Sequence, residues 1–248
     1  MIIFTTYKEL SEETTCAIAS WSKTFPEARI FIFGDFDSFD TKDDIIHFRR
    51  PAMSETGLPL LNDMFKQVYT TNDEIYLLIN ADCLITPDME RASLFLAGIS
   101  MAMRTDYLAV GQRTEIAPEA GRLVHEVNCL GRWAKMGKHK LPACGVDWFL
   151  FNRSAFRPDR IPPFHYARYS YDNWLIYDAL QRGVLVVDCS KDIPVYHMTH
   201  PEQKVRQCPD ADENKRLARA SYPKWDEWQG WINQATITLE ELRLQWDT

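Results

Sequence analysis

The first hundred residues alternate between two hydrophobic periods. Short apolar runs of the kind that form buried strands occur at residues 2–6, 29–34, 44–48 and 75–79. Longer segments with helical spacing lie between and after them, at residues 9–24, 59–69 and 88–103. This alternation predicts an α/β fold with a mostly parallel, Rossmann-like sheet that carries helices on both faces.

The regular pattern stops at residues 112–145, which hold glycines and basic residues without a sustained period. We expect an irregular insertion there, over the active face. The pattern then predicts a helix at residues 172–182, ended by Gly183, and strands at 146–151, 184–187 and 193–196. We expect two parts in the chain: a main domain of residues 1–205 and a helical extension of residues 206–248 packed on it.

Tryptophan recurs every three residues in that extension, at Trp225, Trp228 and Trp231. Residues at this spacing lie along one face of a helix. Packing of a C-terminal helix against the core is the favoured interpretation. The alternative is an aromatic platform for a sugar ring or a base.

The composition is that of an ordinary globular protein, with 46% hydrophobic and 25% charged residues in 248. The net charge of −7 argues against a broad electrostatic surface for nucleic acid or anionic lipid. The six cysteines form no Cys-x-x-Cys pair, and no apolar run is long enough for a signal peptide or a bilayer span. We therefore expect reduced thiols, a cytoplasmic protein and no membrane span.

The most informative segment is the apolar run at residues 75–79, which ends abruptly in Asn80-Ala81-Asp82. In open α/β sheets, ligands bind just beyond the carboxyl ends of the strands. On extended backbone, Asn80 and Asp82 point to the same side, and two converging oxygens can hold a divalent cation and, through it, a diphosphate. The alternative is that Asp82 only opens a turn.

Polar residues also follow the first two strands, where parallel strands place them at the same edge. Thr5, Thr6 and Tyr7 offer hydroxyls and a ring that suit a nucleobase and ribose, and Asp35 suits sugar hydroxyls. Turn chemistry explains any one such segment. Several together at one edge predict a ligand site, although the chain has no Gly-x-Gly-x-x-Gly and no Walker-type phosphate loop.

Three further positions carry candidate chemistry. Asp147 is an aspartate in an otherwise apolar strand, either functional or a satisfied structural carboxylate. Asp172 precedes an apolar helix, where it is an N-cap or a general base facing an acceptor hydroxyl. His197 and His200 follow the last strand of the main domain, where they are structural or metal ligands.

These segments resemble the GT-A-fold, nucleotide-sugar-dependent glycosyltransferase-like proteins. The motifs that carry the resemblance occur in one order over residues 1–205: Phe4-Thr-Thr, Ser20-Trp21, Ile32-Phe-Gly-Asp35, Gly57-Leu-Pro-Leu-Leu61, Ile79-Asn-Ala-Asp82, Asp147-Trp-Phe-Leu-Phe151, Tyr171-Asp-Asn-Trp-Leu175 and His197-Met-Thr-His200. The Asp-x-Asp motif of such enzymes appears here as Asn80-Ala81-Asp82, so its first aspartate is missing.

The resemblance implies a role for each of these residues. Asp82 binds the divalent cation, with His197 or His200 completing its shell; Asp172, or next Asp147, acts as the base; and the nucleotide-sugar donor meets Thr5, Thr6, Tyr7, Asp35, Asn62 and Asn80. The implied cofactor is Mn²⁺ or Mg²⁺, which stabilises the charge on the leaving diphosphate as a Lewis acid. Mn²⁺ tolerates a histidine ligand better.

The function predicted on this basis is transfer of a sugar from a nucleoside diphosphate to an acceptor hydroxyl. A catalytically silent nucleotide-sugar-binding protein is one alternative, because asparagine replaces an aspartate at position 80. A nucleotide-sugar hydrolase or a nucleotidyltransferase on a similar sheet is another. The acceptor is open: a carbohydrate is favoured, and the acidic net charge weighs against modified nucleic acid.

Overall fold

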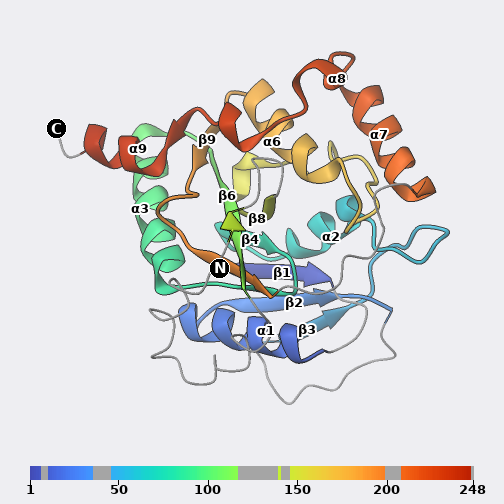
Figure 1. Ribbon diagram of the computed structural model, residues 1–248, viewed down its shortest axis with the longest axis horizontal. Helices are drawn as coiled ribbons and strands as arrows, with labels where there is room; N and C mark the ends of the chain where they lie inside the picture. The colour runs from blue at the N-terminus through green and yellow to red at the C-terminus, as the bar shows by residue number, and fades with distance from the viewer. Residues whose placement is uncertain (7–10, 36–45, 117–138, 141–145, 199–207, 247–248) are drawn as a thin grey trace.

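The computed structural model describes residues 1–6, 11–35, 46–116, 139–140, 146–198 and 208–246 (Figure 1). Its main sheet has the strand order β11-β9-β6-β8-β4-β1-β2-β3. These strands are β1 (Ile2–Thr6), β2 (Arg29–Phe33), β3 (Ile46–Arg49), β4 (Ile75–Ile79), β6 (Tyr107–Ile116), β8 (Val146–Asn152), β9 (Leu185–Asp188) and β11 (Ile237–Thr238).

The sheet is parallel except at its centre. Strands β4, β1, β2 and β3 run parallel to one another, as do β6, β9 and β11. Strand β8 lies between β4 and β6 and is antiparallel to both, with Ile79 opposite Trp148. The beginning of β8 therefore lies at the carboxyl end of β4, which places Asp147 beside the residues that follow β4.

Helices cover both faces of the sheet, as the sequence predicts. One face packs against α1 (Glu12–Thr24), α3 (Pro87–Met103) and α9 (Leu239–Trp246). The other packs against α2 (Leu61–Val68) and α6 (Tyr171–Gln181), beyond which lie α7 (Pro209–Ser221) and α8 (Trp225–Trp228) (Figure 1). Alternate residues of a strand point to opposite faces of the sheet. In β1, Ile3 packs in the core with α1, α3 and α9, and Phe4 packs in the core with α2 and α6.

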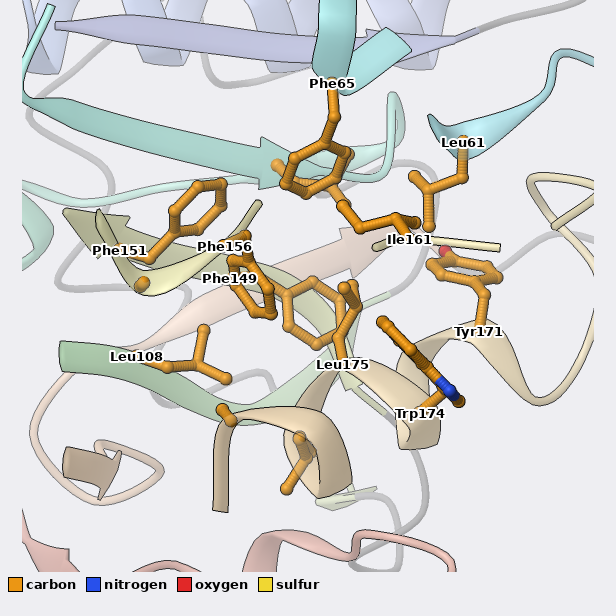
Figure 2. Close-up of a cluster of buried hydrophobic side chains, with 14 of the residues drawn as sticks. Leu61, Phe65, Leu108, Phe149, Phe151, Phe156, Ile161, Tyr171, Trp174 and Leu175 are labelled. Carbon is orange, nitrogen blue, oxygen red and sulfur yellow. The ribbon is translucent and has the colours of Figure 1, made fainter. Parts of the chain in front are cut away.

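An aromatic cluster fixes α2 and α6 to the sheet (Figure 2). Phe65 of α2 stacks on Phe151 of β8 at 5.6 Å between ring centroids and meets Phe4 edge-on at 5.2 Å. All three side chains are fully buried, and burying a phenylalanine contributes about 1.5–3 kcal/mol. Tyr171, Trp174 and Leu175 of α6 belong to the same cluster, so both helices are fixed to this face of the sheet.

The structure corrects the expected start of the insertion. Residues 112–116 belong to β6, a ten-residue strand. Its polar second half and a register shift between Val110 and Gln112 hide it from a hydrophobic pattern. Gly111 sits at the shift because a Cβ there would lie 2.6 Å from the Trp148 ring. Residues 117–138 and 141–145 of the expected insertion lie outside the described residues.

Two local expectations are also corrected at helix ends. The N-cap of α6 is Ser170, with φ of +86°, so Asp172 is the second helical residue and not the cap. Helix α8 ends at Trp228, and Gln229 and Gly230 both have positive φ. Trp231 therefore lies beyond the helix, and the three tryptophans do not form one helical face. Trp225 is buried and packs edge-on against Tyr177 of α6.

In the part of the chain that the structure describes, no helix combines the length and the apolar character that crossing a membrane requires.

Candidate functional site

Three short strand segments place His197 between two carboxylates. His197 lies in β10 (Val195–Met198), antiparallel to β5 (Cys83–Leu84) and parallel to the second half of β6. Its register partners are Cys83 and Glu115. The imidazole Nε2 lies 3.1 Å from Oδ2 of Asp82, and Nδ1 lies 2.8 Å from Oε2 of Glu115. The pairing of β10 thus assembles an Asp82–His197–Glu115 row.

Charge is strongly concentrated in this row. Burial alone would lower the pKa of His197, but its hydrogen bonds to Asp82 and Glu115 outweigh burial and raise the pKa to about 9. Burial likewise opposes ionisation of Glu115, yet the hydrogen bond from His197 and the nearby Arg113 lower its pKa to about 2. Without a metal ion, the imidazole is therefore a cation that donates to a carboxylate at each nitrogen.

Arg113 joins this row to the tip of β4. Its Nε donates to Glu115 Oε1 at 2.8 Å, and its Nη1 donates to Asp147 Oδ2 at 2.6 Å. Asp147 is buried, and burial raises the pKa of its carboxyl while Arg113 opposes the rise. Asn80 Nδ2 donates to the other oxygen, Oδ1, at 2.5 Å. Both carboxylate oxygens of Asp147 therefore have side-chain partners.

Asn80 and Asp82 have different partners. Tyr166 donates its hydroxyl to Asn80 Oδ1 at 3.0 Å, so both atoms of the Asn80 amide are engaged by neighbouring side chains. Asn80 and Asp82 were expected to lie on extended backbone. The backbone after Asn80 instead forms a turn, which Cys83 N–H closes by donating to Asn80 O at 3.1 Å. The turn directs Asp82 toward His197, while Asn80 ties β4 to β8 and Tyr166.

Asp172 lies in the first turn of α6 with an oxygen that lacks a partner. Its Oδ1 is buried and accepts no hydrogen bond from the described residues. Burial raises the pKa of this carboxyl to about 7, backbone N–H groups at the start of α6 oppose the rise, and the charge of Asp147 adds to it. The neighbouring Tyr171 packs on Tyr166 with ring centroids 5.0 Å apart, which connects this turn to the Asn80 cluster.

The predicted donor residues that the structure describes lie at the carboxyl edge of the sheet. Thr5 Oγ1 and Asn62 Oδ1 are buried and have no hydrogen-bond partner among the described residues. Thr6 donates its hydroxyl to Phe33 O at 2.6 Å. Asp35 follows β2, is largely exposed and pairs with Arg50. Buried polar atoms without partners are uncommon in native proteins and call for an explanation such as a ligand or water.

Two predicted residues, Tyr7 and His200, lie outside the described residues. Conversely, Arg113, Glu115 and Tyr166 connect the site but were not predicted from the sequence. Arg113 and Glu115 are two apart in β6, so recognition of that strand would have put both on one face. Nothing in the sequence pattern distinguishes Tyr166 from other loop tyrosines.

Asp82 and His197 are the described side chains that could share a cation. Their separation of 3.1 Å is that of a direct hydrogen bond, and it is also close to the about 3.0 Å between two ligands at right angles that each lie about 2.1 Å from an ion. Glu115 holds the opposite ring nitrogen, as carboxylates do for metal-binding histidines. Among the described residues no group of three or more such side chains is arranged to hold a metal, so this pair would need further ligands from elsewhere.

Comparison with known proteins shows the fold. No protein-family model and no curated sequence matches this chain. In structure it is similar to S. aureus TarS 1-349 in complex with UDP-GlcNAc, with a TM-score of 0.50 and 13% identity over 89% of this chain and 65% of that one. TarS 1-349 alone gives 0.52 and 11%, over 89% and 64%.

The match to a longer TarS chain has a TM-score of 0.52 and 13% identity, and covers 88% of this chain and 39% of that one. This chain therefore spans just under two thirds of the TarS 1-349 structures. TarS is a GT-A-type glycosyltransferase, and the likeness confirms the predicted GT-A-like α/β fold.

Proposed function

We propose that this chain is a glycosyltransferase that moves a sugar from a nucleoside diphosphate to an acceptor hydroxyl. The observation that carries the proposal is Asp172. A buried carboxylate oxygen without a partner, in a group whose pKa is raised to about 7, has the properties of a general base. It lies at the sheet edge where ligands bind in open α/β folds.

The donor is held, in this proposal, by the residues at the ends of β1 and β4 and the start of α2. Thr5 and Asn62 offer oxygens without partners there, with Thr6, Tyr7 and Asp35 beside them in the sequence or the sheet. TarS has been crystallised with UDP-GlcNAc and with UDP, which makes UDP-sugars the first donors to test. Asn80 supports this region through Asp147 and Tyr166.

Asp82 and His197 would hold the divalent cation, with His200 as a further candidate. Mn²⁺ suits a carboxylate and an imidazole better than Mg²⁺ does. When bound, the cation neutralises charge on the leaving diphosphate. Glu115 keeps the His197 ring oriented by its contact with Nδ1, and it is itself fixed by Arg113.

Asp172 then acts on the acceptor. Its carboxylate takes the proton of the acceptor hydroxyl as that oxygen bonds to the anomeric carbon, and the nucleoside diphosphate leaves with the electron pair of the broken bond. The acceptor class we favour is a carbohydrate, because a net charge of −7 disfavours nucleic acid. We also propose a cytoplasmic location, because the cysteine pattern predicts reduced thiols.

The test combines binding with turnover. UDP-, GDP- and ADP-sugars are screened by thermal shift with and without Mn²⁺, and release of nucleoside diphosphate is followed with a panel of carbohydrate acceptors. We expect stabilisation by one donor and acceptor-dependent release. Failure of every donor to bind would contradict the proposal, and release of free sugar without acceptor would indicate a hydrolase.

A silent nucleotide-sugar-binding protein is the second candidate. Its specific support is Asn80, which stands where the related motif has an aspartate and has its amide occupied by Asp147 and Tyr166. Donor binding without turnover against any acceptor would favour it.

A further inference from the structure

The segment at residues 165–170, here called the approach segment, leads directly into the site. It carries Tyr166, whose hydroxyl reaches Asn80, and it ends two residues before Asp172. Two of its residues have left-handed backbone: Ala167 has φ of +61° and Ser170 has φ of +86°. Neither is glycine, and such conformations persist only where the surrounding structure over-determines them.

Helix α7 supplies that constraint through Asn214. This side chain is fully buried. Its Oδ1 accepts the backbone N–H of His165 at 2.8 Å, and its Nδ2 donates to the carbonyl oxygens of His165 at 2.9 Å and Tyr169 at 3.1 Å. One amide therefore holds the backbone at both ends of the approach segment.

Asp210, one turn earlier in α7, holds the side chains of the same segment. Its Oδ1 lies 2.7 Å from His165 Nδ1 and accepts the Thr56 hydroxyl at 2.7 Å. Its Oδ2 lies 3.8 Å from Arg168 Nε. Asp210 is itself buried. Both residues are on the side of α7 that meets the approach segment.

A purely structural role would be packing of α7 on the core, and other residues of α7 already provide it. Ala218 is fully buried in the same core cluster as α6. Tyr222, which follows the helix, donates to Asp178 of α6 at 2.6 Å. The contacts of Asn214 and Asp210 go instead to a strained loop that carries one site residue and precedes another.

We propose that Asn214 and Asp210 are positioning residues, which hold the approach segment so that Tyr166 keeps its contact with Asn80 and Asp172 meets the acceptor in a fixed geometry. The inference rests on the proposed transferase function. Helix α7 then has a part in turnover, although it follows residues 1–205, which carry the motifs.

Asn214→Ala tests it, with Asn214→Asp as the second variant because aspartate keeps the acceptor and the volume but loses the donor. We expect turnover to fall on the order of a hundredfold, the cost of misplacing reacting groups by about 1 Å, while donor affinity stays nearly unchanged. Ala218→Gly is the matched control: it weakens the same helix but leaves the approach segment untouched. Equal loss of turnover in this control, at equal loss of melting temperature, would overturn the proposal.

Rescue gives a second criterion. Ser170 makes no side-chain cap bond, and glycine adopts its φ without strain. Adding Ser170→Gly to Asn214→Ala should recover part of the turnover, because less constraint is then needed. No recovery, with a folded double variant, would count against positioning through the strained backbone.

Amide hydrogen exchange separates this idea from the proposed function. The His165 amide donates to Asn214 Oδ1, so Asn214→Ala should speed its exchange while amides in β4 stay protected; Asn214→Asp keeps this acceptor and should leave the His165 amide slow. Unchanged exchange at residues 165–170 in Asn214→Ala would overturn the positioning role of Asn214 even in an active enzyme. Absence of turnover in the unmodified chain would instead refute the transferase function, and the exchange result would still decide whether α7 constrains the segment.

Discussion

The Nε2 atom of His197 lies 3.1 Å from Oδ2 of Asp82, which joins β10 to the turn that follows β4. This contact brings together two residues that were predicted separately, from distant segments of the sequence, as metal ligands. The structure adds Glu115 behind the ring and Arg113 behind Glu115. The proposed cation site is therefore the end of a charged chain that reaches Asp147.

Replacement of Asp82 or His197 by alanine should remove the effect of Mn²⁺ on donor binding. In the proposal both side chains ligate the same cation, so either loss leaves too few ligands. Titration calorimetry with UDP, with and without Mn²⁺, measures the effect. Asp88→Ala removes a more exposed carboxylate that pairs with Arg91 and should change nothing. A full Mn²⁺ effect in the Asp82 variant would refute its assignment.

Glu115→Gln should weaken the same site without removing a ligand. Outer-shell partners of metal-binding histidines typically contribute about 10–100-fold in metal affinity, and Glu115 contacts Nδ1 of His197 at 2.8 Å. We expect a weaker apparent affinity for Mn²⁺, measured from the Mn²⁺ dependence of UDP binding, with UDP affinity at saturating Mn²⁺ preserved. Equal Mn²⁺ affinity in both proteins would show that Glu115 has no part in the site.

Ionisation of Asp172 should raise the activity and lower the stability of the protein as the pH rises. As a base it must be ionised, so activity should rise with pH through about 7, the value to which burial raises its pKa. Asp172→Asn should lower turnover about a hundredfold or more and abolish that pH limb. A pH–rate profile with the same limb in both proteins would return Asp172 to a structural role.

For stability the sign is reversed. A carboxyl whose pKa rises on folding favours the folded state below its unfolded pKa and loses that contribution as pH rises through about 7. The melting temperature of Asp172→Asn, relative to the unmodified chain, should therefore be higher at pH 8 than at pH 5.

Arg113→Ala should destabilise the fold because it leaves the buried Asp147 carboxylate without its ion-pair partner. Breaking one side of a buried pair typically costs about 3–5 kcal/mol. Urea unfolding of Arg113→Ala, Asp147→Asn and the double variant gives the coupling energy. We expect the double variant to be more stable than Arg113→Ala alone; strictly additive losses would show that the pair is not coupled.

Gly230→Ala tests how the C-terminal residues pack on α6. A Cβ at this position would lie 2.1 Å from Asn173 O, and the φ of +61° disfavours other residues. We expect a loss of about 1–3 kcal/mol in the free energy of unfolding. Gly98→Ala is the control, since a Cβ there meets nothing within 4 Å in the interior of α3; it should stabilise by about 0.5–1 kcal/mol. Similar effects of the two changes would contradict the observed packing.

The sequence by itself determined the strands and helices of the parallel half and the residues that follow them. Hydrophobic periodicity is local, so it marks the strand that ends at Asn80 and the helix that begins near Asp172, and parallel strands place their carboxyl ends together. Hydrophobic periodicity did not predict β6, because Gly111 and the polar second half of the strand break the local pattern.

Only the tertiary structure decided which side chains meet. His197 faces Asp82 and Glu115 because β10 pairs with both β5 and β6, and strand pairing between distant segments leaves no local signal. Contacts between distant segments likewise pair Asp147 with Asn80 and Arg113. They also place Asn80 against Tyr166 rather than beside Asp82. Residue types and spacing name candidates for chemistry, but distances between segments remote in the chain assign their partners.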